Sequence, residues 1–424
     1  MVTRRQFLAA TGAFSLPLVL GACSSGSSGG AGQPLDVIWW GADDRARITE
    51  AVFDLYEAKH AGSTVQGQFL PFGDYFNKLN TLSAAGAVPD VMQMNLPNLA
   101  TYAKDGLLLD LESELTLDLG DYPAASLETG RIDGKLYGIN FGYQYLTTTY
   151  NSALVERSGL QVPTDPADWN AWADFAQALS EALGEGIYGM SDNSAESNAL
   201  AAWIQGRGKS LYTPDAGLGY DLSDIEAWYQ YWADLRARGA IAPGPQSQTY
   251  VSGGGAADDP LTTGLSVITF SPIVQFQGYQ EVNSEPLALA ACPTGPEGRG
   301  EVNPFFGWSV SASSENLQAV QDFLTVWFTD PAAFEILGLD RAVPASPTQL
   351  QEVAKSATGA VKTMLDFLEA NPVEPASQPA PPAVGARITD VQKRAAEGLV
   401  VGAMSPQQAA AMYMEEAEAA VQDA

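Results

Sequence analysis

Residues 35–62 read LDVIWWGADDRARITEAVFDLYEAKHAG, and the pattern in this stretch decides the fold. The apolar run 35–40 stops at Gly41, which is typical of a short buried strand. After it, apolar residues recur on one helical face until Gly62, which predicts an amphipathic helix. The stretch therefore predicts a strand, a loop and a helix in that order.

The same order repeats further along the chain. We expect a strand at 65–72, a helix at 74–85 and a third strand at 90–95. Alternating strands and helices specify a parallel sheet covered by helices, so the predicted fold class is α/β. Ligands of such sheets bind at the carboxyl ends of the strands, which here are residues 40–44, 72–75 and 95–98.

The length and the composition limit both the architecture and the chemistry. A chain of 424 residues exceeds what one hydrophobic core supports, so two lobes are expected. Its 21 Lys and Arg against 50 Asp and Glu give a net charge of −29, which argues against nucleic acid as a partner. One histidine, His60, and two cysteines are too few for a Cys/His zinc site. A histidine-dependent catalytic triad could use only His60. We therefore expect no catalytic residues, no metal and no cofactor.

The N-terminus has the order of an export signal. Arg4 and Arg5 precede an apolar run that ends at Leu20 and is short for a bilayer-spanning helix. Residues 3–8, TRRQFL, resemble a twin-arginine export signal. We expect residues 1–22 to be a signal peptide that is removed on export.

A lipid anchor is expected directly after this signal. Residues 20–23, LGAC, resemble a bacterial lipobox, in which the cysteine receives a diacylglycerol. We expect lipidated Cys23 and a flexible tether over 23–34, because the Ser and Gly residues there offer nothing to bury. This places the protein outside the cytoplasm, at the cell surface or in the periplasm, anchored to the cell membrane.

A β-like stretch at 135–151 separates the first set of strands and helices from a new helical region. We interpret it as a crossing between two lobes. Further strands are expected at 266–270 and 287–292. Four tryptophans on helical stripes are assigned to the core: Trp172, Trp228, Trp232 and Trp327.

Several short motifs follow one another in the order typical of one protein family. They are FNKLNTLSAAG (76–86), PDV (89–91), YAKDGLLLD (102–110), GKLYGI (134–139), YN (150–151), GL (159–160), GWSVSASS (307–314) and SPQQA (405–409). As a collinear series they resemble the family 1 extracellular solute-binding proteins, the receptor components of carbohydrate ABC importers.

The resemblance implies a two-lobe periplasmic-binding-protein-like fold of type II, with the ligand cleft between the lobes. It also implies a non-catalytic, lipid-anchored receptor that closes around a neutral sugar or oligosaccharide and delivers it to an ABC permease. We expect a monomer. Each lobe is expected to combine discontinuous segments, 35–142 with 261–309 in the N-terminal lobe and 143–260 with 310–424 in the C-terminal lobe.

A sugar site needs aromatic rings for the apolar faces of the sugar and polar side chains for its hydroxyls. The aromatic candidates at strand ends, at the crossing or at a loop boundary are Trp40, Phe72, Tyr75, Tyr143, Tyr145, Phe305, Phe306 and Trp308. The resemblance adds Trp203. The polar candidates are Asp43, Asp74, Asn95, Gln144, Ser271 and Arg341.

Some of these candidates have a structural alternative. Trp40 and Trp203 could pack in the core. Asp43 and Asp74 could cap the helices that follow them. Arg341 could pair with the preceding Asp340.

Two other functions remain open at this point. The acidic residues could supply the carboxylate pair of a secreted glycoside hydrolase, although no pair stands out by local motif. The second alternative function is that of a receptor for a non-sugar ligand, such as a polyamine or a peptide. A polyamine site would need several converging carboxylates, and an anion site would need Lys or Arg, which are scarce here.

Overall fold

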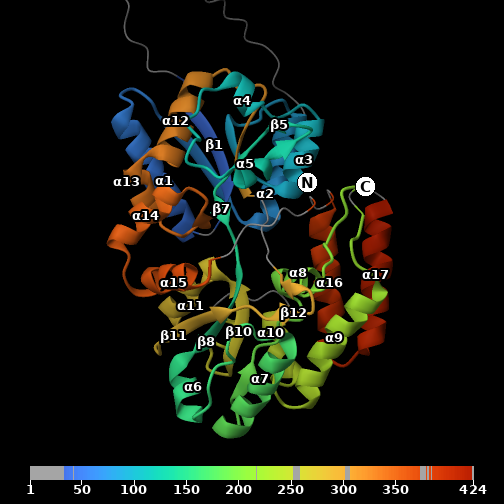
Figure 1. Cartoon of the computed structure of the whole chain (residues 1–424). Helices are drawn as coiled ribbons and strands as arrows, with labels where there is room; N and C mark the ends of the chain where they lie inside the picture. Colours follow the sequence, from blue (N-terminus) through green and yellow to red (C-terminus); the bar gives the residue numbers. More distant parts are fainter. Residues whose placement is uncertain are drawn as a thin grey trace, which may run out of the picture.

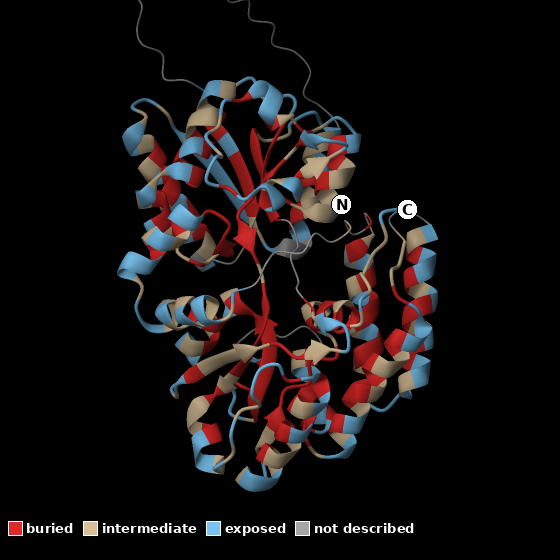
Figure 2. Cartoon of the chain, in the orientation of Figure 1, coloured by how far each residue is buried: buried red, intermediate tan, exposed pale blue. Residues whose placement is uncertain are grey.

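A computed structural model describes residues 33–41, 43–215, 217–251, 258–300, 306–372, 379, 382 and 384–422. These residues form two α/β lobes joined by a neck that contains the short strand β7 (Figure 1). Each lobe has its own buried interior, and the neck strand is buried as well (Figure 2). The predicted two-lobe α/β architecture is confirmed.

The first lobe is built on a five-stranded sheet. Its strand order is β2 (Val65–Leu70), β1 (Leu35–Trp40), β3 (Val91–Asn95), β14 (Phe306–Val310) and β6 (Ile139–Asn140). The first three strands are parallel, as the sequence predicted, whereas β14 runs antiparallel to both β3 and β6. The strand that separates β3 from β6 is therefore supplied by a distant part of the chain.

Helices cover both faces of this sheet because successive strand residues point to opposite sides. Trp39 packs edge-on against Phe53 of α1 (Asp43–Lys59), with ring centroids 5.3 Å apart. Trp40 packs against Tyr75 of α2 (Phe72–Ala84) at 5.1 Å. The remaining elements are α3 (Leu96–Lys104), α4 (Leu111–Glu114), α5 (Ala124–Glu128), β4 (Arg131–Ile132), β5 (Lys135–Leu136), α12 (Leu317–Thr329), α13 (Pro331–Leu337) and α14 (Pro347–Ser356).

The second lobe is built on a four-stranded sheet. Its order is β11 (Leu287–Ala291), β8 (Leu146–Asn151), β10 (Ser266–Pro272) and β9 (Tyr188–Met190). Its helices are α6 (Ser152–Ser158), α7 (Trp169–Leu183), α8 (Ser197–Gln205), α9 (Leu222–Ala237), α10 (Gly244–Val251), α11 (Phe276–Val282), α15 (Gly359–Ala370), α16 (Gly385–Val400) and α17 (Pro406–Gln422). A 3₁₀ turn, η2 (Ile273–Gln275), and the hairpin β12 (Thr294–Gly295) and β13 (Gly298–Arg299) complete it.

The tryptophans that the sequence assigned to the core lie there. Trp172, Trp228 and Trp232 are at most 2% exposed within the second lobe, and Trp327 is equally buried in the first. Burial of an aromatic side chain of this size contributes about 3 kcal/mol or less per residue to stability. Both lobes therefore contain large aromatic side chains buried in their interiors.

The neck is held by a backbone pairing between β7 (Gly142–Tyr143) and β15 (Val343–Pro344). A Cβ atom at Gly142 would lie 2.0 Å from the carbonyl oxygen of Val343, and Gly142 has a φ of +155°. Only glycine allows so close an approach in this conformation. The chain changes lobe here and again between α14 and α15 (Figure 1). It also changes lobe between β13, which pairs with β12 in the second lobe, and β14, which belongs to the first sheet.

The distribution of segments between the lobes differs from the expected division. Strands β10 and β11, which fall within 261–309, pair with β8 and belong to the second lobe. Helices α12 and α13, which fall within 310–424, pack on α1 of the first lobe. The pattern of apolar residues indicates a strand or helix but not its partner, and all seven residues of β10 are buried, as a central strand requires.

Candidate functional site

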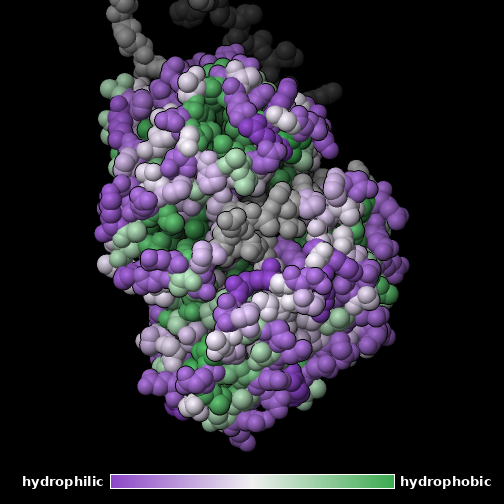
Figure 3. All heavy atoms as spheres, in the orientation of Figure 1, coloured by the Kyte–Doolittle hydropathy of each residue, from purple (hydrophilic) through white to green (hydrophobic). Residues whose placement is uncertain are grey.

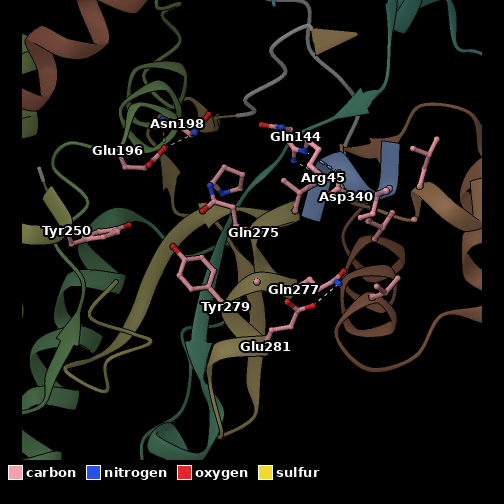
Figure 4. A pocket seen from close by; sticks show the side chains of 18 of the residues that line it. Arg45, Gln144, Glu196, Asn198, Tyr250, Gln275, Gln277, Tyr279, Glu281 and Asp340 are labelled. Carbon is pink, nitrogen blue, oxygen red and sulfur yellow. Dashed lines mark hydrogen bonds and ion pairs between the residues drawn. The ribbon is translucent and has the colours of Figure 1, made fainter. Parts of the chain in front are cut away.

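A cavity of about 940 Å³ lies between the two lobes. The first lobe lines it with the first turns of α1 and the end of α13, and the neck contributes Gln144 (Figure 4). The second lobe contributes the loop after β9, the end of α10, η2, α11 and one residue each of α15 and α16. Its size lies within the range of small-molecule sites.

An ion pair orients the polar groups on the first-lobe side. Arg45 of α1 donates from Nε to Asp340 Oδ2 at 3.1 Å and from its terminal nitrogen to the Asp340 carbonyl at 2.9 Å. Both side chains are about a quarter exposed, at 26% and 23%. Arg45 is therefore held at the cavity wall with part of its guanidinium free to face a ligand.

Glu196 and Asn198 stand on the second-lobe side, where the loop after β9 enters α8. Glu196 caps α8, accepting from the backbone nitrogen of Asn198 at 3.1 Å and from its amide at 2.6 Å. Burial raises the pKa of Glu196 in spite of these bonds and of the nearby Lys393 ammonium. Asp192 of the same loop is neutralised by Arg236 of α9.

The floor of the cavity carries amides and two tyrosines. Gln275, Gln277 and Tyr279 come from η2 and α11, and Tyr250 comes from α10 (Figure 4). Gln277 donates to Glu281 at 2.9 Å. Aliphatic side chains complete the lining: Ile48, Val274, Ile336, Leu337, Leu339 and Val361.

This arrangement provides both hydrogen-bond donors and acceptors. Amides and tyrosines do both, while the carboxylates accept. Hydrophilic residues dominate the visible surface of both lobes, and hydrophobic ones gather beside the groove between them (Figure 3).

Within the described residues, no group of three or more His, Cys, Asp and Glu could hold a metal ion. The described helices include none with the length and apolar content needed to cross a membrane.

Among the residues that the sequence pointed to, Gln144 lines the cavity. Its neighbours Tyr143 and Tyr145 are buried in the neck, at 6% and 9% exposure, with their rings 6.2 Å apart. The crossing was therefore located correctly, but the polar residue between the two tyrosines is the one that reaches the cleft.

Most of the aromatic candidates lie in the cores of the lobes instead of the cleft. Tyr75 is fully buried, and its hydroxyl donates to the backbone carbonyls of Ile38 and Gln93. Phe306 and Trp308 pack edge-on against Phe141 at 5.4 and 5.3 Å. β14 is an inner strand covered on both faces, so its aromatics do not reach the surface.

Trp203 also belongs to a core. It is 5% exposed in α8 and lies edge-on to Trp169 at 5.3 Å and Trp228 at 5.6 Å. The guanidinium of Arg207 covers its ring at 3.5 Å. The core alternative holds for this residue because α8 packs on the sheet of the second lobe.

Four candidates lie at the strand ends of the first lobe but outside the described lining of the cavity. Trp40 is half-buried against Tyr75. Asp43 and Asp74 are exposed in the first turns of α1 and α2, and Asn95 caps α3 by accepting from the Asn98 nitrogen at 3.3 Å. The sequence left capping open for Asp43 and Asp74, but Asp74 lies inside the first turn of α2, whose N-cap is Pro71 without a side-chain cap hydrogen bond. Asn95 is the candidate that caps a helix.

Ser271 and Arg341 are buried beneath the cavity. Ser271 Oγ lies 3.4 Å from Thr149 Oγ1 within the second sheet. Arg341 is 4% exposed, bonds to Thr49 and donates to Gln93 at 2.9 Å. Burial and the neighbouring Arg45 lower the pKa of Arg341 to about 9. The residue in this turn that faces the cavity is Asp340.

Three predicted residues and one predicted segment lie outside the described part of the chain. They are Phe305, the side chain of Phe72, Cys23, and the signal peptide at 1–22.

Sequence reasoning missed Arg45, Glu196, Asn198, Tyr250 and Tyr279. The polar run SDNSAESN (191–198) directly follows β9, so the rule that places ligands at strand ends would have reached it. β9 has only three residues, too few to show a periodic pattern. For the two tyrosines the sequence holds no distinguishing signal, because both lie within short helices.

Two α/β lobes with a polar cavity between them define the class of two-lobe binding proteins of type II. Residues 51–363 match the family described as bacterial extracellular solute-binding protein. The chain belongs to this family, and it is a solute-binding protein.

Known proteins resemble the chain over most or part of its length. The extracellular solute-binding protein family 1 from Alicyclobacillus acidocaldarius subsp. acidocaldarius is 28% identical with a TM-score of 0.73, and the match covers 92% of this chain and 98% of that one. A periplasmic oligogalacturonide binding protein from Yersinia enterocolitica is 19% identical with a TM-score of 0.77 over 92% and 99%. The galactooligosaccharide-binding protein of Bacillus subtilis is 24% identical over 50% of this chain and 48% of its own.

Glu196→Gln is expected to remove a pH-dependent loss of stability. Because the pKa of Glu196 is raised in the folded protein, the folded state binds this proton more tightly than the unfolded state. Stability therefore falls as the pH rises from the ordinary glutamate range through the raised pKa, and then levels off. Urea unfolding between pH 4 and pH 8 should show that the free energy of unfolding of the variant rises relative to that of the wild type as the pH increases.

The exposed Glu156 on α6 provides the control as Glu156→Gln. A difference between Glu196→Gln and the wild type that is the same at every pH would contradict the assignment.

Proposed function

We propose that this solute-binding protein is the receptor of an ABC importer for a neutral sugar or oligosaccharide and that it captures its ligand by closing the two lobes. The observation that carries this proposal is the cavity, because side chains from both lobes and from the neck face one space. A ligand that contacts both lobes stabilises a closed arrangement relative to an open one.

The chemistry of the lining supports a polyhydroxylated ligand. Sugar hydroxyls donate and accept, and the amides, carboxylates and tyrosines of the lining offer both functions. Three of its charged side chains are already paired, Arg45 with Asp340 and Asp192 with Arg236. Pairing reduces the net charge that a ligand meets, which favours a neutral one. The names of the relatives from Yersinia enterocolitica and Bacillus subtilis support a saccharide.

The proposal extends to the location and the partner. Lipidated Cys23, after removal of a signal peptide at 1–22 and before a tether at 23–34, would hold the receptor at the outer side of the cell membrane. A monomer anchored in this way reaches a membrane-embedded permease without a further adaptor. No chemical step is assigned to the cleft.

The test is a binding measurement on the exported form without its lipid. Calorimetry and thermal unfolding are carried out with maltotriose, galactotriose, raffinose and digalacturonic acid. A neutral sugar is expected to bind and remain intact, and at 100 times its dissociation constant it adds about 2.7 kcal/mol to stability. Gln144→Ala should weaken this binding, whereas Gln161→Ala, at an exposed glutamine outside the cavity lining, should leave it unchanged.

Three results would overturn the proposal. The protein would be a glycoside hydrolase if it continuously released shorter sugars and if replacing one carboxylate of the cavity abolished this release. Binding of spermidine or of a peptide without binding of any sugar would assign a different ligand class. Binding restricted to digalacturonic acid would reject the neutral ligand.

A further inference from the structure

Two tyrosine hydroxyls face each other in the cavity. Tyr250 reaches in from α10 and Tyr279 from α11, and their hydroxyl groups point toward one another (Figure 4). Each hydroxyl is hydrogen-bonded to a different buried side chain on the side away from the cavity. This difference gives the two hydroxyls opposite hydrogen-bonding roles.

Tyr279 is backed by a carboxylate. Asp259 is fully buried, and its Oδ2 accepts from the Tyr279 hydroxyl at 3.0 Å and from Thr269 Oγ1 at 2.8 Å. Its Oδ1 accepts from Ser191 Oγ at 2.7 Å and from the Leu261 nitrogen at 2.8 Å. Four donors thus fix the carboxylate as an acceptor. Tyr279 is 2% exposed, and because its hydrogen is used in this bond, its oxygen can only accept, on the side that faces Tyr250.

Tyr250 is backed by an amide. Asn193 is 1% exposed, and its Nδ2 donates to the Tyr250 hydroxyl at 3.1 Å and to the Phe270 carbonyl at 3.2 Å. Its Oδ1 accepts from the Phe270 nitrogen at 3.2 Å, so the orientation of the amide is fixed by the backbone of β10. Since the Tyr250 oxygen already accepts a hydrogen bond, its own hydrogen is left to donate. That hydrogen is directed at the facing Tyr279 oxygen, so a ligand hydroxyl meets both groups by inserting between the two tyrosines.

We propose that Tyr250 and Tyr279 together recognise a single hydroxyl group of the ligand, Tyr250 donating to it and Tyr279 accepting from it, and that Asn193 and Asp259 are the positioning residues that set these roles. A hydroxyl is matched to this pair because it accepts and donates through one oxygen. An ether or carbonyl oxygen satisfies Tyr250 alone. This inference rests on the proposed function and specifies how the same site selects a hydroxylated ligand.

The test removes each hydroxyl while keeping its ring. Tyr250→Phe and Tyr279→Phe are titrated calorimetrically with maltotriose, galactotriose and raffinose. Each is expected to weaken binding of the sugar that the wild type takes by about tenfold, because one hydrogen bond is lost in a buried site. Tyr229→Phe is the matched control, since Tyr229 is fully buried in the second lobe and its hydroxyl donates to the Gln392 carbonyl at 3.3 Å, outside the cavity lining.

The positioning role requires a separate measurement. Asp259→Asn offers Tyr279 an N–H group, so the tyrosine can turn its own hydrogen toward the cavity and two donors then meet the ligand. Binding should fall, and Asp259→Asn combined with Tyr279→Phe should bind no more weakly than Tyr279→Phe alone. A merely structural role of Asp259 would instead reduce binding equally in both backgrounds. If Asp259→Asn does not fold, Asn193→Asp replaces it, and its affinity should match that of Tyr250→Phe.

The outcomes separate this inference from the proposed function. A wild type that binds none of the three sugars overturns the proposed function and this inference with it. A wild type that binds, with unchanged affinity in both Phe variants, overturns the inference alone. Losses that add fully in the double variant refute the positioning role of Asp259.

Discussion

Gly307→Ala is expected to destabilise the first lobe by about 3 kcal/mol. A Cβ atom at this position would lie 1.9 Å from the carbonyl oxygen of Ile139, which no side chain can occupy without moving the backbone. The strand β6 would have to withdraw from β14 and lose the pairing of Gly307 with Asn140. Because β6 leads directly into the neck, the change should also disturb closure.

Urea unfolding followed by circular dichroism measures the effect. Gly120→Ala is the control, because its nearest neighbour, Asp118 Oδ1, would lie at 3.4 Å and the site is exposed. Equal stability of Gly307→Ala and the wild type would show that β6 and β14 are not paired as described.

Trp308→Ala is expected to cost about 3–5 kcal/mol of unfolding free energy. The side chain is fully buried, with its ring 5.0 Å from that of Trp327 and 5.3 Å from that of Phe141. Truncation leaves a cavity that Phe141, between β6 and β7, and Trp327 of α12 are too firmly anchored to fill. Trp308→Phe keeps most of the contacts and should cost much less.

Sugar affinity distinguishes this assignment from the one that the sequence favoured. Measured at a temperature at which the variant is folded, the affinity of Trp308→Ala should equal that of the wild type. Lost binding with little change in stability would instead place Trp308 in the ligand site.

Local sequence patterns were sufficient to predict the first five elements of the first lobe, β1, α1, β2, α2 and β3. Alternation within β1 placed Trp39 and Trp40 on opposite faces of the sheet, and the two residues do pack against different helices. The patterns could not predict which strand pairs with which. The assignment of β10 and β11 to the wrong lobe follows from this, because an apolar strand is equally suited to either sheet.

The site was harder to predict because its chemistry is spread over weak signals. Gln144 was found through its place in the crossing, whereas Glu196 follows a strand of three residues. Aromatic residues at strand ends were favoured as ligand contacts, but Tyr75 and Trp308 fill the core, where rings of this size contribute most to stability. Burial depends on the packing of distant segments, which spacing along the chain does not report.

The insertion of β14 between β3 and β6 has a consequence for biosynthesis. All four strands of the second sheet are made before residue 306, so the ribosome releases a complete set of strands for the second lobe while the first sheet still lacks its inner strand. During that interval β3 and β6 present open edges that can pair with other nascent chains. The lobe that begins the chain is therefore the last to complete its sheet.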